Sequence, residues 1–429
     1  MSAAPATSPS DVYRGRRDRP EGPLLVPKHR YTDAAFAALE DEKLWPHTWQ
    51  LACVEEQVPD PGDYLEVQVG RDSVVVVRGQ DGTLRAFHNV CSHRGFQLCE
   101  GSGNAQEIRC GFHDWCYDLK GRLRGMPYAA RFGDVDRAEL GLQPVRLENW
   151  GRMVFVNLDP SAESLLDTLD PLPKELAAFR LEEYTCHTAG TVPMAGNWKT
   201  TIDAFSEIYH LLGIHPQMKA MMDDLNTRFE SWPGGHSMMC IPFGKNSPIL
   251  GKVTEREIFA SYVYTYGGML DHDPSEADSV DVPSGMSARQ HAENRVSARG
   301  QRLGLDYSGL ETSRLLDDWH YLVFPNLIFN VHAEMYTIFR ATPGSDPNQS
   351  HFDFFFFRRL PKGGSETHSK PGFTRFDGHT GIEVLDQDLD GIARVQRGLQ
   401  SSGFADMVFG NFETRLANMH QELDRRLGL

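Results

Sequence analysis

Two short pairs of metal-binding residue types lie close together in the first third of the chain. The first pair is Cys91 and His93 in NVCSHRG, and the second is Cys110 and His113 in RCGFHDW. Thiolates and neutral imidazoles bind zinc and iron well in proteins. The four side chains together predict a metal site, either a structural zinc ion or an iron-sulfur cluster.

The composition of each pair favours the iron-sulfur cluster. Zinc modules usually join Cys with Cys and His with His, whereas here each pair contains one of each. The arrangement resembles the ligand set of a Rieske [2Fe-2S] centre, in which two imidazoles raise the potential to roughly −150 to +300 mV. Such a cluster can accept electrons and pass them on. The second loop departs from the usual Rieske pattern at Gly111, where Pro is common, and at Asp114, where Gly is common.

A second group of candidate ligands follows further along the chain. It reads Asn197-Trp198-Lys199, then Glu207-Ile208-Tyr209-His210, then His215-Pro216. On a helix Glu207 and His210 would share a face, so the carboxylate could hydrogen-bond the ring of a metal-bound histidine. A five-residue step turns by about 140° on a regular helix. We therefore expect His210 and His215 to bind one metal only where the helix is distorted or has ended.

The third ligand of such a site is expected to be a carboxylate. Two His and one Asp or Glu leave positions on Fe(II) open for dioxygen and substrate. The candidates are Asp386, Asp388 and Asp390 in VLDQDLDGIARVQRG, and neighbouring members would point in different directions on a helix. The segment from Asn197 to Pro216 resembles the iron-binding segment of Rieske oxygenases, and this resemblance selects Asp388. The other two are interpreted as solvated acids near a helix start.

With both sites matched, the chain resembles the large catalytic (alpha) subunit of Rieske non-heme iron oxygenases, the aromatic ring-hydroxylating dioxygenase family. The resemblance covers the chain from about Tyr31 to the C-terminus. It implies an α+β fold, in which a β-rich Rieske [2Fe-2S] domain is inserted in a helix-grip catalytic domain with an antiparallel sheet. The predicted parts are a flexible tail (1–28), an N-terminal helix of the catalytic part (29–46), the Rieske domain (47–160) and the catalytic mononuclear iron domain (161–429).

Hydrophobic periodicity predicts the elements that must position these residues. Strand patterns cover 63–90, 142–158, 320–343 and 350–360, and helical patterns cover 164–181, 197–212 and 382–400. The run Phe354 to Phe357 is interpreted as core, with one face able to line a pocket. The polar segment 267–315 is poor in large apolar residues, so we expect it to bury little. It is interpreted as a surface excursion or cover near a substrate entrance, with a solvated pair of helices as the alternative.

The resemblance also implies roles for particular residues. His210, His215 and Asp388 would hold a mononuclear Fe(II), beside the Rieske cluster as the second cofactor. Family members form homotrimers, some with a small beta subunit, in which Glu207 would bridge His210 to His113 of the partner subunit. Asn197 would lie close to the iron without binding it.

The resemblance implies an enzyme, the terminal oxygenase of a multicomponent system. It would use O2 and electrons from an NAD(P)H-dependent reductase, with or without a ferredoxin, to hydroxylate a hydrophobic, cyclic or aromatic compound. Many ring-dihydroxylating members carry Asp where this chain has Glu207. Oxidative demethylation or monooxygenation of a quaternary ammonium or other non-aromatic substrate is therefore an alternative. A Rieske electron carrier without catalysis is an alternative from another class.

Composition limits the function further. The chain has 429 residues and a net charge of −16, which argues against nucleic acid as a partner. No apolar stretch matches a signal peptide or a membrane span, so we expect a cytoplasmic protein. No Gly-rich nucleotide fingerprint is present, so the electrons should come from another protein. Five further cysteines are interpreted as reduced thiols, namely Cys53, Cys99, Cys116, Cys186 and Cys240.

Overall fold

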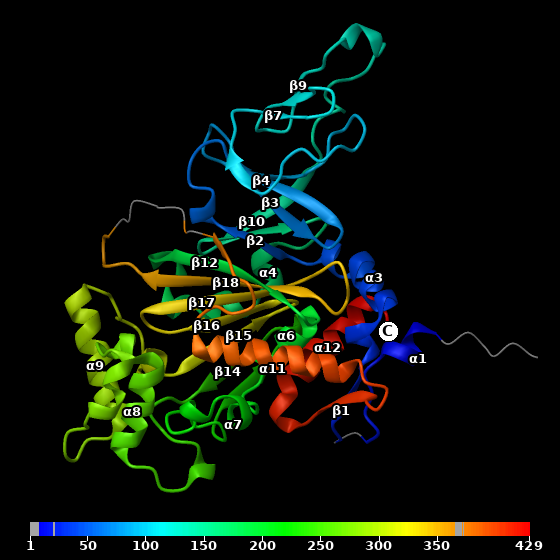
Figure 1. Cartoon of the computed structure of the whole chain (residues 1–429). Helices are drawn as coiled ribbons and strands as arrows, with labels where there is room; N and C mark the ends of the chain where they lie inside the picture. Colours follow the sequence, from blue (N-terminus) through cyan, green and yellow to red (C-terminus); the bar gives the residue numbers. More distant parts are fainter. Residues whose placement is uncertain (1–7, 20–21, 365–370, 372) are drawn as a thin grey trace, which may run out of the picture. The chain divides into compact units, whose positions relative to one another are not determined.

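The computed structural model describes residues 8–19, 22–364, 371 and 373–429 (Figure 1). It divides into two compact units. One unit runs from Ala38 to Asp170, a range that encloses the predicted Rieske segment 47–160. The other unit contains the described residues up to Ala37 and those from Pro171 onward, apart from Pro371. The predicted domain bounds themselves stay a prediction.

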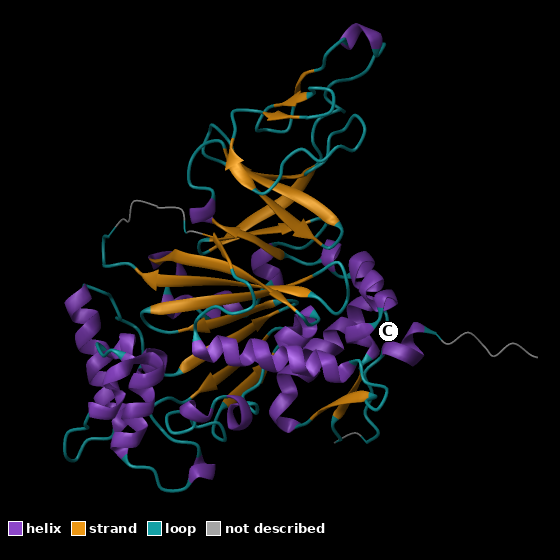
Figure 2. Ribbon diagram, viewed as in Figure 1, coloured by secondary structure: helices purple, strands orange, loops and turns teal. Residues whose placement is uncertain are grey.

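The unit 38–170 is built mainly from β-strands, as the alternation of its sequence predicted (Figure 2). Its described strands form a seven-stranded sheet in the order β2-β11-β10-β5-β4-β3-β6 and a small sheet in the order β7-β8-β9. The larger sheet contains β2 (Gln50–Val54), β3 (Asp63–Val69), β4 (Asp72–Arg78), β5 (Leu84–His88), β6 (Ser102–Asn104), β10 (Pro144–Trp150) and β11 (Met153–Asn157). The small sheet contains β7 (Ile108–Arg109), β8 (Cys116–Tyr117) and β9 (Leu123–Gly125). The two predicted ligand pairs lie in the loops β5–β6 and β7–β8.

The other unit is organised around an eight-stranded sheet with the described order β13-β14-β15-β16-β17-β18-β12-β19. All neighbouring strands pair antiparallel except β12 and β19. The strands are β12 (Tyr184–Met194), β13 (Arg228–Ser231), β14 (Ser237–Ile241), β15 (Asp318–Val323), β16 (Leu327–Val331), β17 (Met335–Pro343), β18 (Ser350–Arg359) and β19 (Phe373–Arg375). The aromatic run of β18 is core, since Phe354, Phe355 and Phe357 are buried.

Helices cover one face of this sheet (Figure 1). α6 (Trp198–Phe205) packs against β16, β17 and β18, and α11 (Glu383–Leu399) packs on α6. α12 (Thr414–Leu427) lies against β13 and β14. The predicted helix-grip arrangement with an antiparallel sheet is therefore confirmed, and α11 matches the predicted helix 382–400.

Two predicted helices are shorter and more broken than expected. The range 164–181 contains α4 (Leu165–Thr168) and α5 (Leu172–Glu175), separated at Pro171. Proline lacks the N–H that an interior helical position needs and restricts the residue before it, so the helix cannot continue there. The range 197–212 contains α6 and the start of α7 (Leu211–Ile214), with a non-helical stretch between them. The apolar pattern continues across this break, which is why periodicity alone missed it.

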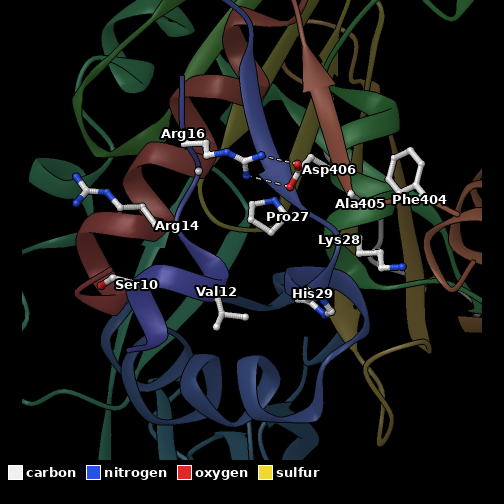
Figure 3. A pocket seen from close by; sticks show the side chains of 11 residues that line it. Ser10, Val12, Arg14, Arg16, Pro27, Lys28, His29, Phe404, Ala405 and Asp406 are labelled. Carbon is white, nitrogen blue, oxygen red and sulfur yellow. Dashed lines mark hydrogen bonds and ion pairs between the residues drawn. The ribbon is translucent and has the colours of Figure 1, made fainter. Parts of the chain in front are cut away.

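Described residues between 8 and 28, within the predicted flexible tail, form regular structure. α1 (Pro9–Tyr13) is helical, and β1 (Leu24–Pro27) pairs antiparallel with β20 (Asp406–Phe409). Figure 3 shows Arg16 in a bidentate ion pair with Asp406, next to the paired strands β1 and β20. Pairing with a distant strand stabilised this Pro- and Arg-rich segment, and composition could not show that partner. Residues 1–7 and 20–21 of the predicted tail lie outside the described residues.

The polar segment 267–315 buries more than its composition suggested. It contains α9 (Ala288–Leu303) and α10 (Thr312–Leu316), and α8 (Glu255–Tyr266) precedes it. Ala288, Ala292 and Val296 of α9 are buried in the core cluster that also contains Phe259 of α8. Small residues let α9 pack closely without large apolar side chains, so a low content of large residues did not mean low burial. No helix among the residues that the structure describes is long and apolar enough to cross a bilayer.

The close packing of α9 gives a stability prediction. A methyl group added at Gly300 would overlap the ring of Tyr307, whereas one added at Gly398 in α11 would meet no atom within 4 Å. Overpacking of this kind costs about 1–3 kcal/mol, so we expect Gly300→Ala to lower the thermal unfolding midpoint by a few degrees. Gly398→Ala is the matched control and should leave the midpoint unchanged or raise it slightly. Equal midpoints for the two variants would show that α9 is not packed as described.

Candidate functional site

The helix that carries the predicted iron ligands ends early. Asn197 begins α6 as its N-cap, where its side chain accepts a hydrogen bond from the Lys199 amide at 3.0 Å. After Phe205 the chain leaves the helix, and α7 extends only to Ile214. His215 follows with φ −117° and ψ 63°, outside the helical region. The predicted end of the helix between the two histidines is therefore present.

A buried arginine satisfies the end of α6. Arg415 of α12 is fully buried, and it donates to the Ser206 carbonyl at 3.1 Å and to His320 Nδ1 at 3.2 Å. The last carbonyls of a helix have no partner within the helix, so a donor from another element stabilises the break. Burial lowers the pKa of Arg415 to about 9. Sequence reasoning missed this residue, because its neighbours come from distant parts of the chain.

The break brings three predicted ligands together. Single ligand atoms of His210, His215 and Asp388 all lie within 4.8 Å of one another. Asp388 Oδ1 is 2.9 Å from His215 Nε2 and 3.7 Å from His210 Nε2. Two imidazoles and one carboxylate on one side of a metal form the facial arrangement that non-heme Fe(II) uses. The donor set and its convergence therefore fit that ion.

The remaining nitrogen of each imidazole has an oxygen partner. His210 Nδ1 lies 2.7 Å from Glu207 Oε1, and His215 Nδ1 lies 2.8 Å from Gln387 Oε1. Partners of this kind fix the ring orientation and keep the proton on Nδ1, which leaves both Nε2 atoms free to bind a metal. Glu207 Oε2 also accepts from the His210 amide at 3.0 Å. Gln387 was missed, although its position next to Asp388 was a usable signal.

The other two acidic residues of α11 point elsewhere. Asp386 accepts hydrogen bonds from the Thr380 and Gly381 amides and so holds the turn before the helix. Asp390 is exposed and lies 3.5 Å from His379. Asp388 alone of the three is buried and faces the histidines. The predicted divergence of the three side chains is therefore observed.

Asn197 does not join this group. Its side-chain amide donates to the carbonyls of Tyr31 and Pro347, at 3.2 and 2.6 Å. It caps the start of α6, whereas Glu207 and His210 follow the other end, about 12 Å away for a helix of this length. Asn197 is also absent from the residues that line the cavity next to the ligands. The structure therefore places Asn197 at the start of α6, away from the predicted iron ligands, which differs from its predicted place beside the iron.

The three ligands open onto a cavity of about 540 Å³ within the same unit. Most of its wall is apolar and includes Phe205, Met218, Met222, Met239, Phe339 and Phe357. Its polar wall residues, apart from the ligand group, include Asp318, His320, Asn330, His332 and Thr337. A cavity of this size and character suits an organic molecule with a mainly apolar body.

Burial controls the charge of the polar wall. It raises the pKa of Asp318 to about 7 and lowers the pKa of His332 to about 4. Burial also lowers the pKa of His320 well below its usual value, and the Arg415 charge adds to that shift. Both imidazoles are therefore neutral near pH 7. Sequence reasoning missed this wall, although Asp318 and His320 share a strand face at a spacing of two residues.

The two Cys-His loops of the other unit share one backbone pattern. The Cys91 amide donates to the Phe96 carbonyl at 2.8 Å, and the Cys110 amide donates to the Trp115 carbonyl at 2.8 Å. Each cysteine carbonyl then accepts from the residue four positions later, Gly95 or Asp114, at 3.0 Å. The residue that closes each turn adopts the left-handed backbone conformation, with φ +73° at Gly95 and +58° at Asp114. Asp114 therefore adopts a conformation that favours glycine, and it occupies the position where glycine is common in the usual Rieske pattern.

The side chains of these loops fit a [2Fe-2S] cluster. Both thiols, Cys91 and Cys110, are buried, and the rings of His93 and His113 have centroids 4.6 Å apart. The Nδ1 atoms of the two histidines are buried and have no hydrogen-bond partner among the described residues. Buried polar atoms without partners are rare in folded proteins, and binding to iron would satisfy both. Tyr117 adds a hydroxyl 3.2 Å from Cys91 Sγ.

Comparisons with known proteins find two matching domains in this chain. Residues 48–146 match the Rieske [2Fe-2S] domain, and residues 181–429 match the catalytic domain of the ring hydroxylating alpha subunit. The glycine betaine monooxygenase oxygenase subunit of Chromohalobacter salexigens is 33% identical over 219 residues, which are 50% of this chain and 48% of that protein. The biphenyl dioxygenase subunit alpha of Paraburkholderia xenovorans is 32% identical over 260 residues, 53% of this chain and 55% of that protein.

Similarity to these curated relatives therefore spans about half of their length. Among solved structures, a quaternary ammonium Rieske monooxygenase in complex with L-carnitine has a TM-score of 0.66 at 19% identity, covering 95% of this chain and 97% of that one. Naphthalene 1,2-dioxygenase from Rhodococcus sp. has a TM-score of 0.65 at 21% identity, covering 94% of each chain. Together with the domain matches, these folds show that the chain belongs to the family of Rieske ring-hydroxylating oxygenase alpha subunits.

Proposed function

We propose that this chain is the terminal oxygenase component of a multicomponent Rieske oxygenase. The observation that carries the proposal is the convergence of His210, His215 and Asp388 at the wall of a mainly apolar cavity. A Rieske electron carrier would need neither this group nor the cavity. An organic substrate in the cavity would lie next to the open side of the metal.

The ligand assignments are part of the proposal. Cys91, His93, Cys110 and His113 would hold the [2Fe-2S] cluster, and His210, His215 and Asp388 would hold Fe(II). When bound, the two groups would supply electrons one at a time and a site where O2 is activated. Glu207 would keep His210 oriented and its Nδ1 protonated through the 2.7 Å contact. In a homotrimer Glu207 would also contact His113 of the partner subunit.

The cavity favours a hydrophobic organic substrate. Its wall is dominated by methionine and aromatic side chains, which bind apolar surfaces without demanding one shape. The comparisons support a second candidate, a quaternary ammonium compound, because two relatives named above act on such compounds. Reductase and ferredoxin partners, and a small beta subunit, remain proposals from the family resemblance.

The test is product analysis with labelled dioxygen. The purified, iron-replete protein is incubated with a surrogate NAD(P)H reductase, ¹⁸O2 and one compound at a time from a panel of neutral aromatic, neutral alicyclic and quaternary ammonium compounds. We expect ¹⁸O in the product of at least one compound. An oxidised cluster after mixing with reductase and O2, but no labelled product with any class, would support an electron carrier instead.

The cluster assignment gives the first ligand prediction. Cys91→Ser and His113→Ala should remove the visible absorption and the paramagnetic signal of the reduced cluster, because each substitution removes a ligand. Cys99→Ser is the control. Burial raises the pKa of Cys99 to about 11, so it stays a protonated thiol, and its replacement should leave both signals. Full signals in Cys91→Ser would show that the ligands are misassigned.

The mononuclear site gives a second ligand prediction. His210→Ala or Asp388→Ala should keep a reducible cluster, lose one iron per chain and abolish substrate oxidation. Asp390→Ala changes an exposed acid on the same helix and should keep all its iron and activity. Iron content is measured by mass spectrometry and the cluster by its visible spectrum. Unchanged iron in Asp388→Ala would remove this residue from the site.

Glu207 gives a third prediction, which separates electron transfer between the cluster and the iron from metal binding. Glu207→Gln keeps shape but loses the charge that favours a protonated ring nitrogen on His210. We expect it to retain both metals, while reoxidation of the reduced cluster in a single turnover slows by at least about 10-fold. Glu383→Gln is the matched control, since Glu383 is an exposed acid of α11 that accepts a hydrogen bond from the Tyr264 hydroxyl. Wild-type rates in a metal-replete, trimeric Glu207→Gln variant would contradict the proposed role.

A further inference from the structure

Three buried polar atoms without hydrogen-bond partners gather on one wall of the cavity. They are Asp318 Oδ1, Asn330 Oδ1 and His332 Nδ1, and each has no partner among the described residues. All three residues line the cavity that holds the proposed iron ligands. Buried polar groups are usually satisfied, so several orphans at one cavity point to a missing partner. A ligand in the cavity could supply that partner.

Strand register places these residues side by side. β15 and β16 pair antiparallel, with His320 opposite Asn330 and Trp319 opposite Val331. The same register continues to Asp318 and His332, whose Oδ1 and Nε2 atoms lie 3.6 Å apart. The two cross-strand pairs, Asp318 with His332 and His320 with Asn330, therefore form a polar floor on one face of the sheet.

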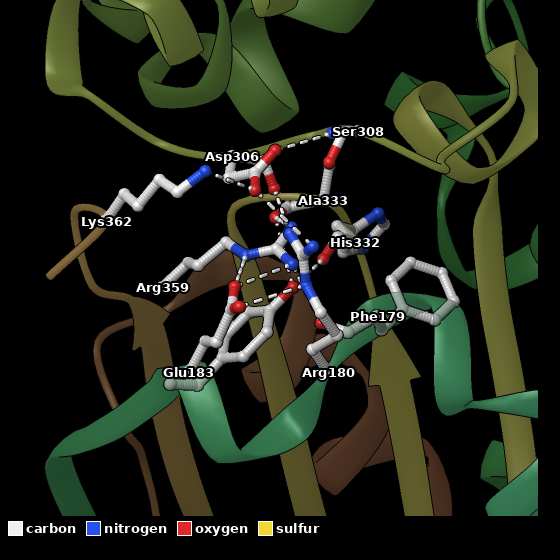
Figure 4. A network of polar contacts seen from close by, with 10 residues as sticks. Phe179, Arg180, Glu183, Asp306, Ser308, His332, Ala333, Arg359 and Lys362 are labelled. Carbon is white, nitrogen blue, oxygen red and sulfur yellow. Dashed lines mark hydrogen bonds and ion pairs between the residues drawn. The ribbon is translucent and has the colours of Figure 1, made fainter.

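The backbone beneath this polar floor is held firmly. Tyr184 donates from its hydroxyl to the carbonyls of His332 and Ala333, at 3.1 and 3.0 Å. Arg359 donates to the Ala333 carbonyl at 3.2 Å and pairs with Glu183 at 3.1 Å. Figure 4 shows Arg359 among these groups, next to His332. These hydrogen bonds fix the backbone at His332, although the Nδ1 atom of its ring has no hydrogen bond to a described residue.

All three unpartnered atoms are hydrogen-bond acceptors. The amide oxygen of Asn330 accepts by nature, and both oxygens of the Asp318 carboxyl group accept once it is ionised, above pH 7. His332 is neutral because burial lowers its pKa to about 4, so it carries one N–H and one lone pair. The proton belongs on Nε2, which faces the carboxyl oxygen of Asp318, and Nδ1 is then the acceptor. The polar floor thus offers acceptors that call for a donor from the ligand.

We propose that the polar floor, with Asp318 as its anchor, selects substrates that carry a hydroxyl group on an otherwise apolar skeleton. This inference rests on the proposed oxygenase function and deepens it. The hydroxyl would donate a hydrogen bond to the Asp318 carboxylate, while the apolar skeleton fills the methionine and aromatic part of the cavity. Asp318 would therefore set the specificity and the orientation of the substrate relative to the iron.

The polar floor suits a hydroxyl group better than a quaternary ammonium group. A quaternary ammonium group has no N–H, so it would leave the acceptors without a hydrogen bond. The Arg415 cation already lies close enough to Asp318 and His320 to influence the pKa of both. A second cation would be repelled by Arg415, and a neutral donor would not. A hydroxyl donor satisfies the polar floor without adding charge to it.

The test compares the binding of matched probes to the iron-replete protein without reductant, so that no turnover occurs. The probes are 2-naphthol, 2-methoxynaphthalene and trimethyl(2-naphthyl)ammonium, and affinity is measured by calorimetry. A hydrogen bond to a carboxylate is worth roughly 10- to 100-fold in affinity, so wild-type protein should prefer 2-naphthol to 2-methoxynaphthalene by about that factor. Asp318→Leu should abolish the preference, and Asp318→Asn, which keeps shape and one acceptor, should retain part of it.

Thr265→Val is the matched control, because it removes a hydroxyl from the same cavity wall that donates to the Ser261 carbonyl of its own helix and lies outside the polar floor. It should keep the preference for 2-naphthol. Equal binding of the two neutral probes, no binding of either, tightest binding of the ammonium probe, or the same loss in Thr265→Val would overturn the proposal. Binding does not depend on turnover, so a protein that prefers 2-naphthol but oxidises nothing would contradict only the proposed oxygenase function.

Discussion

The central constraint is that two histidines five residues apart cannot bind one metal from an uninterrupted helix. The chain meets this constraint by ending α7 at Ile214, so that His215 lies outside a helix, whereas α6 has already ended at Phe205, before His210. Arg415 stabilises the end of α6 through the Ser206 carbonyl, and the non-helical stretch that follows contains Glu207, which contacts His210. The geometry of the candidate site therefore depends on two helix ends, the first of which is stabilised by a distant element.

Other parts of the unit are arranged around this break. α11 carries Asp388 and Gln387 from near the end of the chain, so one helix supplies both a candidate ligand and the partner of another ligand. Another part of the cavity wall is the face of β15 and β16, where Arg415 also reaches His320. One buried arginine thus links the helix break to the polar wall. A change at Arg415 would affect both the ligand geometry and the substrate side of the cavity.

Local signals predicted much of this from the sequence. Mixed Cys and His pairs, alternating strands and the acid behind His210 depend on short spacings, and those parts agree with the structure. Features that depend on pairing between different strands could not be predicted from the sequence. Examples are the pairing of β1 with β20 and the contact of Asp318 with His332. Asn197 was misplaced because a cap at the start of α6 resembles a ligand neighbour when only spacing is considered. The unusual Asp114, in contrast, was visible in the sequence and proved to have a positive φ.

The proposed function requires two different iron sites in one chain. The direct measurement is a Mössbauer spectrum of the wild-type protein reconstituted with ⁵⁷Fe under anaerobic conditions. We expect signals of a [2Fe-2S] cluster with unequal iron sites, together with a separate high-spin Fe(II) signal amounting to one iron for each cluster. A fully loaded protein that shows the cluster signals alone would contradict the proposed function.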